Sequence, residues 1–358
     1  MYAPLQTIPV LDMGVEPFLV LLVTALAGGA FGAALGALPS FVFTGFVVLL
    51  GEGVGILQGQ LNGLGAINGS LAAGITGTLG FGMVVGPHVA FAGGVAASAY
   101  VGKKYPEMNP NGWDYHLGKD ISSAFGTKPD ILAVGALFGA LGMLITQIAG
   151  GLGFPTDNIA LSVFLTAMIA RVVFRYPLIG SPAGDGLLDM GPFERNEPRE
   201  QPDDVPEGNA GRLAVEPWLG HQYKWLNVTV IGVVGGILGG YIWLETGSVF
   251  LGYGISAASL LFLNLGVAKI PVTHHLTLIG VVGAMIATPM VGGELVPLLA
   301  AGVFGALSGV VGEGAQRIFY SHSETHVDPP AMAIASIMFV VGVLYLLGLL
   351  PNAGYLGL

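Results

Sequence analysis

Long apolar stretches with almost no charge follow one another along nearly the whole chain, and they restrict the fold more than any other feature. A helix needs about 20 predominantly apolar residues to cross a bilayer, and we count about eleven such spans, some of them short. Only 9% of the 358 residues are charged and 53% are hydrophobic, whereas a soluble domain has about 25% charged residues. The runs are unbroken, which excludes the alternating pattern of a membrane β-barrel. The sequence therefore predicts an all-α, polytopic membrane protein.

The apolar stretches divide into single spans and two hairpins. Each hairpin has two apolar runs that meet at a Gly/Pro break with one ionisable residue, His88 in the first and Glu294 in the second. The runs of the first hairpin have only about 16 residues each, so re-entrant or broken helices are the alternative to two full crossings. Single spans are predicted near residues 18–38, 40–58, 130–150, 158–176, 226–245, 248–267 and 330–350, and the hairpins at 71–102 and 276–312.

The order of these features occurs twice, which indicates an internal duplication. A double GxxxG pattern opens each half, at Gly28, Gly32 and Gly36 and again at Gly232, Gly236 and Gly240. Small residues of this kind let helices pack closely in lipid. We predict two five-helix repeats, residues 1–153 and 225–358, joined by a connector helix and a polar cytoplasmic loop in residues 154–224. Glycine-rich helices that resemble each other by composition alone are the alternative.

The basic residues predict an orientation, because Lys and Arg favour the cytoplasmic side of a membrane. With eleven spans, every basic residue follows an even-numbered span. This places the N-terminus in the cytoplasm and the C-terminus outside, and it makes the two repeats parallel. The predicted location is the cell (plasma) membrane. The basic residues are Lys103, Lys104, Lys119, Lys128, Arg171, Arg175, Arg195, Arg199, Arg212, Lys224, Lys269 and Arg317.

Composition excludes several classes of function. The chain has no cysteine, which excludes disulfides, thiolate catalysis and cysteine-based metal sites. The net charge of −10 opposes nucleic-acid binding. The polar stretch 177–224 is predicted to be a loop or a partly disordered linker. With 59 glycines, small-residue helix faces could pack between protomers as well as within one, so a homo-oligomer stays open.

Several segments resemble a known family. They are GAFGAALGALPSFVFTGF, the hairpin pieces GITGTLGFG and GPHVAFAGG, WDYHLGKDI, and GTKPDILAVGALFGALG. Together they look like an uncharacterised prokaryotic membrane-protein family, seen mostly in haloarchaea and some anaerobic bacteria. The resemblance covers most of the chain. It implies a multi-span, permease-like protein, and it transfers no substrate, mechanism or functional residue.

Four ionisable residues are candidates for a transport pathway or for ion coupling. Glu52 lies between two glycines inside an apolar run, where a carboxylate usually faces the bundle interior. Glu313 has the same Gly-Glu-Gly setting, although Arg317 four residues on favours a surface helical pair. His88 and Glu294 occupy the hairpin breaks, where they would line a central cavity or lie in short external turns.

Two further patterns have specific functional interpretations. Thr78, Gly80 and Gly82 resemble the selectivity filter of potassium channels, but the second repeat has no counterpart, so packing glycines are the simpler interpretation. Histidines spaced i, i+4 on a helix can bind a divalent metal ion. The residues of this second pattern are His322 and His326 with Glu324, and His116 with Asp120. A hydrated helix end is the alternative, and no other cofactor is indicated.

No catalytic motif is present, and Asp130, Asp157 and Asp328 stand where a carboxylate would cap the first turn of a span. We therefore predict that the protein is not an enzyme. It is expected to be a transporter or permease for a small solute or ion, with coupling to H⁺ or Na⁺ as an open option. A passive channel and a non-catalytic membrane subunit or scaffold are the alternatives.

Overall fold

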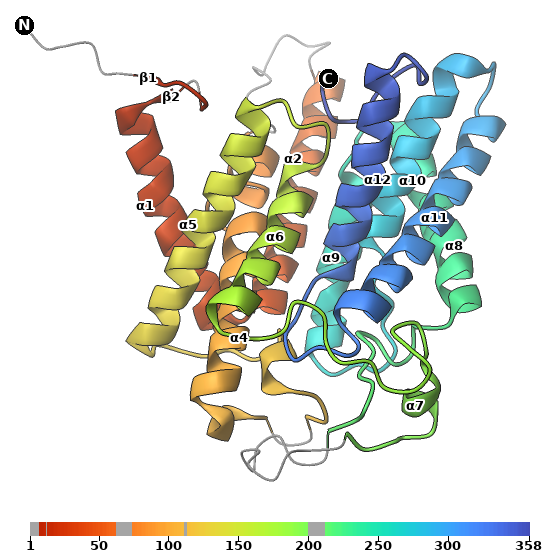
Figure 1. Ribbon diagram of the computed structural model, residues 1–358. Helices are drawn as coiled ribbons and strands as arrows, with labels where there is room; N and C mark the ends of the chain where they lie inside the picture. The colour runs from red at the N-terminus through yellow and green to blue at the C-terminus, as the bar shows by residue number, and fades with distance from the viewer. Residues whose placement is uncertain (1–6, 12, 62–73, 111–112, 200–211) are drawn as a thin grey trace, which may run out of the picture.

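The computed structural model describes residues 7–11, 13–61, 74–110, 113–199 and 212–358, and it consists mainly of helices that run side by side (Figure 1). The long helices before residue 177 are α1 (Val15–Leu35), α2 (Ala37–Leu61), α4 (Ala92–Lys104), α5 (Pro129–Gly151) and α6 (Asn158–Val173). Those after residue 224 are α8 (Trp225–Thr246), α9 (Leu251–Asn264), α10 (His274–Ala287), α11 (Leu295–Phe319) and α12 (Pro329–Leu346). Short elements are β1 (Thr7–Ile8), β2 (Met13–Gly14), the π-helices η2 (Gly74–Gly80) and η3 (Pro87–Phe91), the 3₁₀-helices η4 (Pro106–Met108), η5 (Leu117–Lys119) and η7 (Thr288–Met290), and α7 (Gly191–Glu194).

Among the described residues, six helices are long and apolar enough to cross a membrane: α1, α2, α5, α8, α11 and α12. Large apolar side chains cover their outer faces, as at Val23, Leu226 and Val303, which are 64%, 73% and 65% exposed. Such faces suit lipid rather than water. The all-α fold predicted from composition is therefore confirmed, and the helix lengths indicate a membrane protein.

Glycines hold the helices of the first half together. A Cβ atom at Gly29 of α1 would lie 2.2 Å from the carbonyl oxygen of Gly135 and 2.8 Å from the Cα atom of Gly139, both on α5. A Cβ atom at Gly93 of α4 would lie 2.5 Å from the Gly29 carbonyl oxygen. Three backbones therefore meet at Gly29, and no side chain fits between them.

The second half repeats this arrangement with α8, α10 and α11. A Cβ atom at Gly236 of α8 would lie 2.2 Å from the carbonyl oxygen of Ala301 on α11. One at Gly280 of α10 would lie 2.4 Å from the Gly236 Cα atom. The GxxxG segments thus pack helices against one another, as their composition predicts.

The stretch 71–102 is not a hairpin of two spans, because its described part follows α2 from one end to the other. A Cβ atom at Gly51 would lie 2.2 Å from Thr76 Oγ1, and one at Gly94 would lie 2.7 Å from the Ala37 Cα atom. The chain therefore crosses once, as η2, a turn at 81–85, and then η3 with α4. The proline before His88 and the many glycines account for the break. The second stretch, 276–312, does form two passes, α10 and α11.

Corresponding helices run in opposite directions, so the predicted parallel arrangement is wrong. A Cβ atom at Gly45 of α2 would lie 2.4 Å from the Ala258 amide nitrogen, and one at Gly254 of α9 would lie 3.0 Å from Val48 Cγ1. Residue numbers therefore rise along α2 while they fall along α9. The physical reason is the single crossing at 74–104: it leaves an odd number of passes before α8, which then starts from the opposite end.

The first described element, β1, and the C-terminus lie at one end of the bundle, which we call the terminal end (Figure 1). A Cβ atom at Gly151 would lie 1.9 Å from the Val10 carbonyl oxygen, and Tyr355 Oη donates to Asp157 Oδ2 over 2.8 Å. Gly151 and Asp157 flank the turn between α5 and α6. The prediction that the termini lie on opposite sides is therefore wrong, because the number of passes is even.

The other end of the bundle, which we call the basic end, carries the segments with the Lys and Arg residues (Figure 1). The described parts of 177–224 fold onto this end mainly as loop, the first of the two predicted alternatives; residues 200–211 lie outside the described residues. Arg317 donates to the carbonyl oxygens of Leu188 and Tyr223 over 2.7 and 2.9 Å. Met190, Val215 and Tyr223 form a small apolar cluster. Contact with the helix ends and this small cluster together hold the described parts of the segment in place.

Candidate functional site

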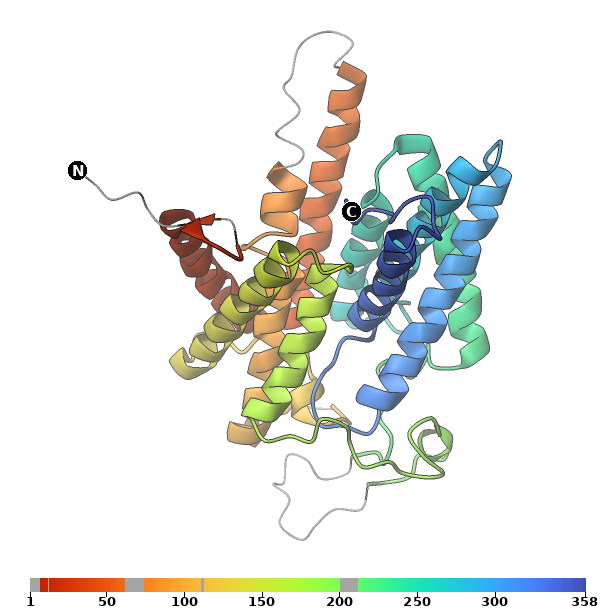
Figure 2. The same cartoon turned by 45° about the horizontal axis from the view of Figure 1, so that its top comes forward.

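The helices from α1 to α6 form one group and those from α8 to α12 form a second group, and the two groups stand side by side in Figure 2. A cavity of about 350 Å³ lies between them. One wall comes from α2, η3 and α6, and the other from α9, α10 and α12. A cavity of this size is in the range of small-molecule sites, which form preferentially where domains or helices meet. The cavity is therefore the candidate functional site.

Aromatic rings from both groups form the middle of the cavity wall. Phe41 of α2 has its ring centre 5.9 Å from that of Phe91, 6.0 Å from that of Tyr253 and 4.8 Å from that of His274. The ring of His326 lies 5.7 Å from that of Phe91. Ring contacts of this kind fix the orientation of the side chains. The wall is thus apolar and rigid, with two imidazoles set into it.

Two aspartates at helix N-termini contribute the carboxylates of the wall. Asp157 accepts from the Ala160 amide over 2.8 Å at the start of α6, and Asp328 accepts from the Ala331 amide over 2.9 Å at the start of α12. Both therefore cap a helix, as their positions predict. Asp130 does not: it lies within the first turn of α5 and accepts from Lys104 over 2.7 Å.

His326 is buried in the wall with no hydrogen-bond partner for either ring nitrogen among the described residues. Its Nε2 atom lies 3.7 Å from Asp328 Oδ1, which is beyond hydrogen-bond distance. Burial lowers the pKa of His326, so the ring is neutral near pH 7. A neutral imidazole offers one donor and one acceptor to whatever occupies the cavity.

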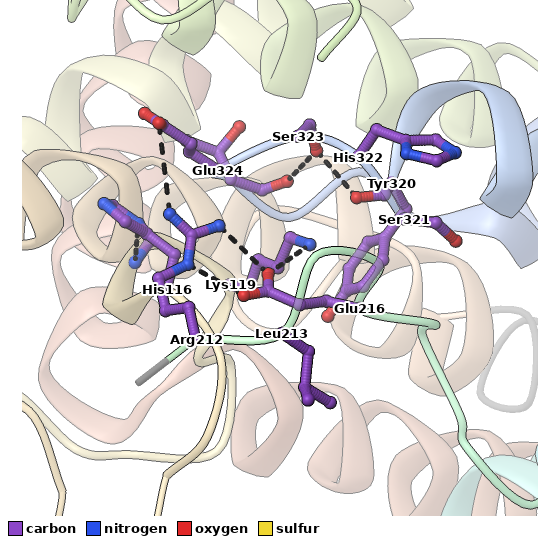
Figure 3. Close-up of polar contacts among 12 residues, drawn as sticks. His116, Lys119, Arg212, Leu213, Glu216, Tyr320, Ser321, His322, Ser323 and Glu324 are labelled. Carbon is purple, nitrogen blue, oxygen red and sulfur yellow. Dashed lines mark hydrogen bonds and ion pairs between the residues drawn. The ribbon is translucent and has the colours of Figure 1, made fainter. Parts of the chain in front are cut away.

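A buried ion-pair network lies at the basic end and contributes Lys119 to the cavity lining (Figure 3). Glu216 lies between two cations: Lys119 Nζ is 2.7 Å from its Oε2 atom, and Arg212 Nε is 2.7 Å from its Oε1 atom. The side chains of Lys119 and Glu216 are 0% exposed. Lys119 also lies 4.6 Å from the ring centre of Tyr320. The network joins the segment after α4 to the segment before α8.

Electrostatics within this network keep the carboxylate charged. Desolvation favours the neutral form of Glu216, but Lys119 and Arg212 outweigh it and lower the pKa of Glu216. Burial lowers the pKa of Lys119, which makes its charge dependent on Glu216. No uncompensated cation therefore faces the cavity from its described lining.

The four pathway candidates are dispersed, and none lines the cavity. Glu52 accepts from Thr76 Oγ1 over 2.9 Å and from Ser248 Oγ over 2.5 Å, so it joins the two helix groups near the terminal end. Glu313 is buried and paired with Arg317, not a surface pair.

The two hairpin-break residues have different surroundings. His88 is 1% exposed, and neither ring nitrogen has a partner among the described residues. Glu294 is exposed in the turn before α11. The expectation that they match each other is wrong, because only the second stretch turns back at its break.

The filter-like residues do not face the cavity. Thr78 and Gly80 lie in η2, and a Cβ atom at Gly80 would lie 3.1 Å from Val48 Cγ2 on α2. A Cβ atom at Gly82 would lie 1.8 Å from the Thr78 carbonyl oxygen. These glycines allow close packing of the irregular segment against itself and α2.

The predicted metal ligands do not form a cluster, and no group of three candidate ligands occurs among the described residues. His322 accepts from the Ala183 amide, and its Nε2 atom lies 3.1 Å from the Leu187 carbonyl oxygen. The helical spacing of His322, Glu324 and His326 fails because α11 ends at Phe319.

The second pair of predicted ligands stabilises a local turn. His116 Nδ1 accepts from the Gly118 amide over 3.0 Å. Asp120 Oδ1 accepts from the Ser122 amide over 2.8 Å. Both side chains therefore cap the chain around η5 and do not meet at a shared ligand position.

Sequence reasoning missed the buried ion pair beside the cavity. Lys119 and Glu216 lie 97 positions apart, and only the fold brings them together. Arg171 was predicted only as a basic residue at the cytoplasmic end of a span, yet it is 0% exposed and donates to the carbonyl oxygens of Leu178 and Phe319 over 2.6 Å each. The sequence did contain one indication of the cavity: two polar segments outside the spans contain tryptophans, and these residues, Trp113 and Trp218, line it.

Fold and site together define a class: an all-helical protein with helices of membrane-spanning length and a cavity between two helix groups. Within that class, the chain belongs to a family of unknown function (DUF7973), whose family model matches residues 10–358. No curated protein and no solved structure matches the chain. Membership of an uncharacterised family is therefore confirmed, while the haloarchaeal and permease-like nature of that family stays a prediction.

Proposed function

We propose that the protein is a membrane transporter that moves a small solute or ion through the cavity between its two helix groups. The observation that carries this proposal is the position of the cavity, whose walls come in equal measure from both groups. Transporters commonly place their substrate at such an interface near the middle of the bilayer.

An inverted repeat supports the proposal. Gly29 and Gly236 are each the meeting point of three helices, and Gly93 and Gly280 are the matching contacts on α4 and α10. His88 precedes Gly93 by as many residues as His275 precedes Gly280, so His275 and not Glu294 corresponds to His88. Inverted repeats around a central site are a common plan among transporters that alternate between two open states.

The same correspondence holds at finer detail. A Cβ atom at Gly142 of α5 would lie 1.7 Å from the His88 carbonyl oxygen, and Ser308 of α11 donates to the His275 carbonyl oxygen over 3.2 Å. Asp157 and Asp328 cap the last helix of each set. We therefore infer two inverted five-helix repeats, with α6 belonging to the first, rather than parallel repeats with a connector helix.

The ends of the cavity favour a gated carrier over an open channel. At the terminal end, the ring of Phe250 lies 4.9 Å from that of Phe81 and 5.6 Å from that of Tyr355. At the basic end, Lys119 is held by Glu216. By the preference of Lys and Arg for the cytoplasm, the basic end faces inward and both termini face outward.

We expect a bulkier side chain at position 41 to block transport. Phe41→Trp adds volume in the cavity wall and should lower solute uptake into proteoliposomes at least tenfold. The matched control is Phe43→Trp on the same helix, where Phe43 is 50% exposed toward the lipid. Equal uptake by the two variants would contradict a pathway through the cavity. No uptake by the wild type, with the protein folded, would favour a subunit or scaffold role.

Glu52 is the candidate for coupling to H⁺ or Na⁺, because its carboxylate bridges the two helix groups through Thr76 and Ser248. We expect Glu52→Gln to retain uptake down a solute gradient but to lose its acceleration by an imposed pH or Na⁺ gradient. Glu245→Gln, an exposed carboxylate at the end of α8, is the control. Gradient-driven uptake that is unchanged in Glu52→Gln would rule out this role.

A further inference from the structure

The chemistry of the cavity wall indicates which kind of solute it receives, and this inference rests on the proposed transport function. The wall combines three features: an unpartnered buried histidine, a carboxylate beside it, and a set of aromatic rings. Each feature recognises part of the same chemical group.

The polar spot at His326 and Asp328 is rich in hydrogen-bond acceptors. Asp328 uses Oδ2 to cap α12, whereas its Oδ1 atom has His326 Nε2 at 3.7 Å. Neither ring nitrogen of His326 has a partner among the described residues, although the side chain is 1% exposed. Unpaired buried polar atoms cost free energy unless a ligand or water satisfies them. A group with several N–H donors would satisfy Asp328 Oδ1 and the acceptor nitrogen of the His326 ring.

The net charge of the wall is negative. Asp157 and Asp328 contribute carboxylates to it. The cation in the described lining, Lys119, is already neutralised by Glu216 at 2.7 Å. An anionic solute would therefore meet repulsion without a free cation to compensate it, whereas a cationic solute would find a counter-ion.

The rings beside this spot suit a cation as well. Phe91 and Tyr320 lie 5.7 and 5.4 Å from the His326 ring, and Phe41 and Tyr253 continue the wall from there. Aromatic faces attract cations, and the attraction rises to about 2 kcal/mol or more when the site excludes water. The same rings can pack against an apolar body attached to the charged group.

We infer that the cavity binds a small organic ammonium ion, whose ammonium group donates to Asp328 Oδ1 and His326 and whose apolar body packs between Phe41, Phe91 and Tyr253. Asp157 at the far side of the cavity already accepts from Ala160 and Tyr355, so it contributes charge rather than a contact. The inference assigns the cavity a solute class, protonated amines.

Calorimetry on the purified, detergent-solubilised full chain tests this inference without requiring transport. The probes are phenethylammonium, the neutral phenethyl alcohol and the anion phenylacetate, which share a ring and differ in charge. We expect phenethylammonium to bind at least tenfold more tightly than the alcohol, and phenylacetate not to bind. Equal binding of the ammonium ion and the alcohol, or tighter binding of the anion, would overturn the inference. This result needs only the wild-type protein.

A variant pair locates the site. Asparagine also caps helices, so Asp328→Asn removes the charge and keeps the cap; we expect it to weaken phenethylammonium binding at least tenfold. Asp130→Asn, which also lies beside a proline at a helix start but outside the cavity lining, should bind as the wild type does. Unchanged binding by Asp328→Asn would overturn the assignment. Binding of phenethylammonium without transport of any solute would support the amine site and contradict the proposed transport function. Transport of other solutes without amine binding would support the transport function and overturn the inferred amine site.

Discussion

Replacing Glu216 by Gln should destabilise the protein by about 3–5 kcal/mol, because removing one partner of a buried ion pair leaves the other charge uncompensated. Lys119 and Glu216 are both 0% exposed, and Arg212 depends on the same carboxylate. Thermal unfolding in detergent, followed by circular dichroism, measures the loss. The control is Glu197→Gln, which breaks an exposed pair with Arg195 and should change stability by no more than about 1 kcal/mol.

A double variant separates the charge effect from the loss of packing. Lys119→Met in the Glu216→Gln background removes the buried ammonium group that has lost its counter-ion, so it should recover part of the lost stability. Equal melting temperatures for Glu216→Gln and Glu197→Gln would contradict the buried network.

The pH dependence of stability has a defined sign. The pKa of Glu216 is lowered from its ordinary value of 4.5 on folding. Its contribution is therefore complete above about pH 4.5 and is lost as the pH falls through the lower, folded-state pKa. In Glu216→Gln this acid-dependent part of the stability should be absent.

Replacing Gly29 by Val should prevent the first helix group from packing, with a loss of about 3 kcal/mol or more. A Cβ atom there would lie 2.2 Å from the Gly135 carbonyl oxygen and 2.8 Å from the Gly139 Cα atom, and backbone atoms cannot rotate away. Reduced yield of monodisperse protein and a lower melting temperature measure the effect. Gly53→Val on α2 is the matched control, because no atom lies within 4 Å of a Cβ built there.

The outcome at Gly236 extends the same test to the second group. Its Cβ atom would lie 2.2 Å from the Ala301 carbonyl oxygen, so Gly236→Val should be as damaging as Gly29→Val. A tolerated Gly29→Val would show that the helices can separate without loss of the fold, which would contradict the close three-helix contact.

Much of the architecture follows from the sequence alone. Apolar runs with few charges determine that the chain is all-helical and of membrane type, because backbone groups in lipid must bond within helices. The glycine spacing of α1 and α8 determines which helix faces pack closely. The positions of Asp157 and Asp328 predict their capping roles correctly, because a helix N-terminus leaves amides that a nearby carboxylate can accept from.

The tertiary structure alone decides the number of passes and hence the relation between the halves. Apolar content is the same for one broken crossing and for a hairpin, so the sequence of 71–102 does not distinguish them; contact with the whole length of α2 does. One pass fewer makes α9 antiparallel to α2, and it is the basis of the proposed inverted repeat in which His275 corresponds to His88. The cavity and its ion pair also depend on tertiary structure, because Lys119 and Glu216, or His326 and Phe91, lie far apart in the chain and meet only when the two helix groups pack together.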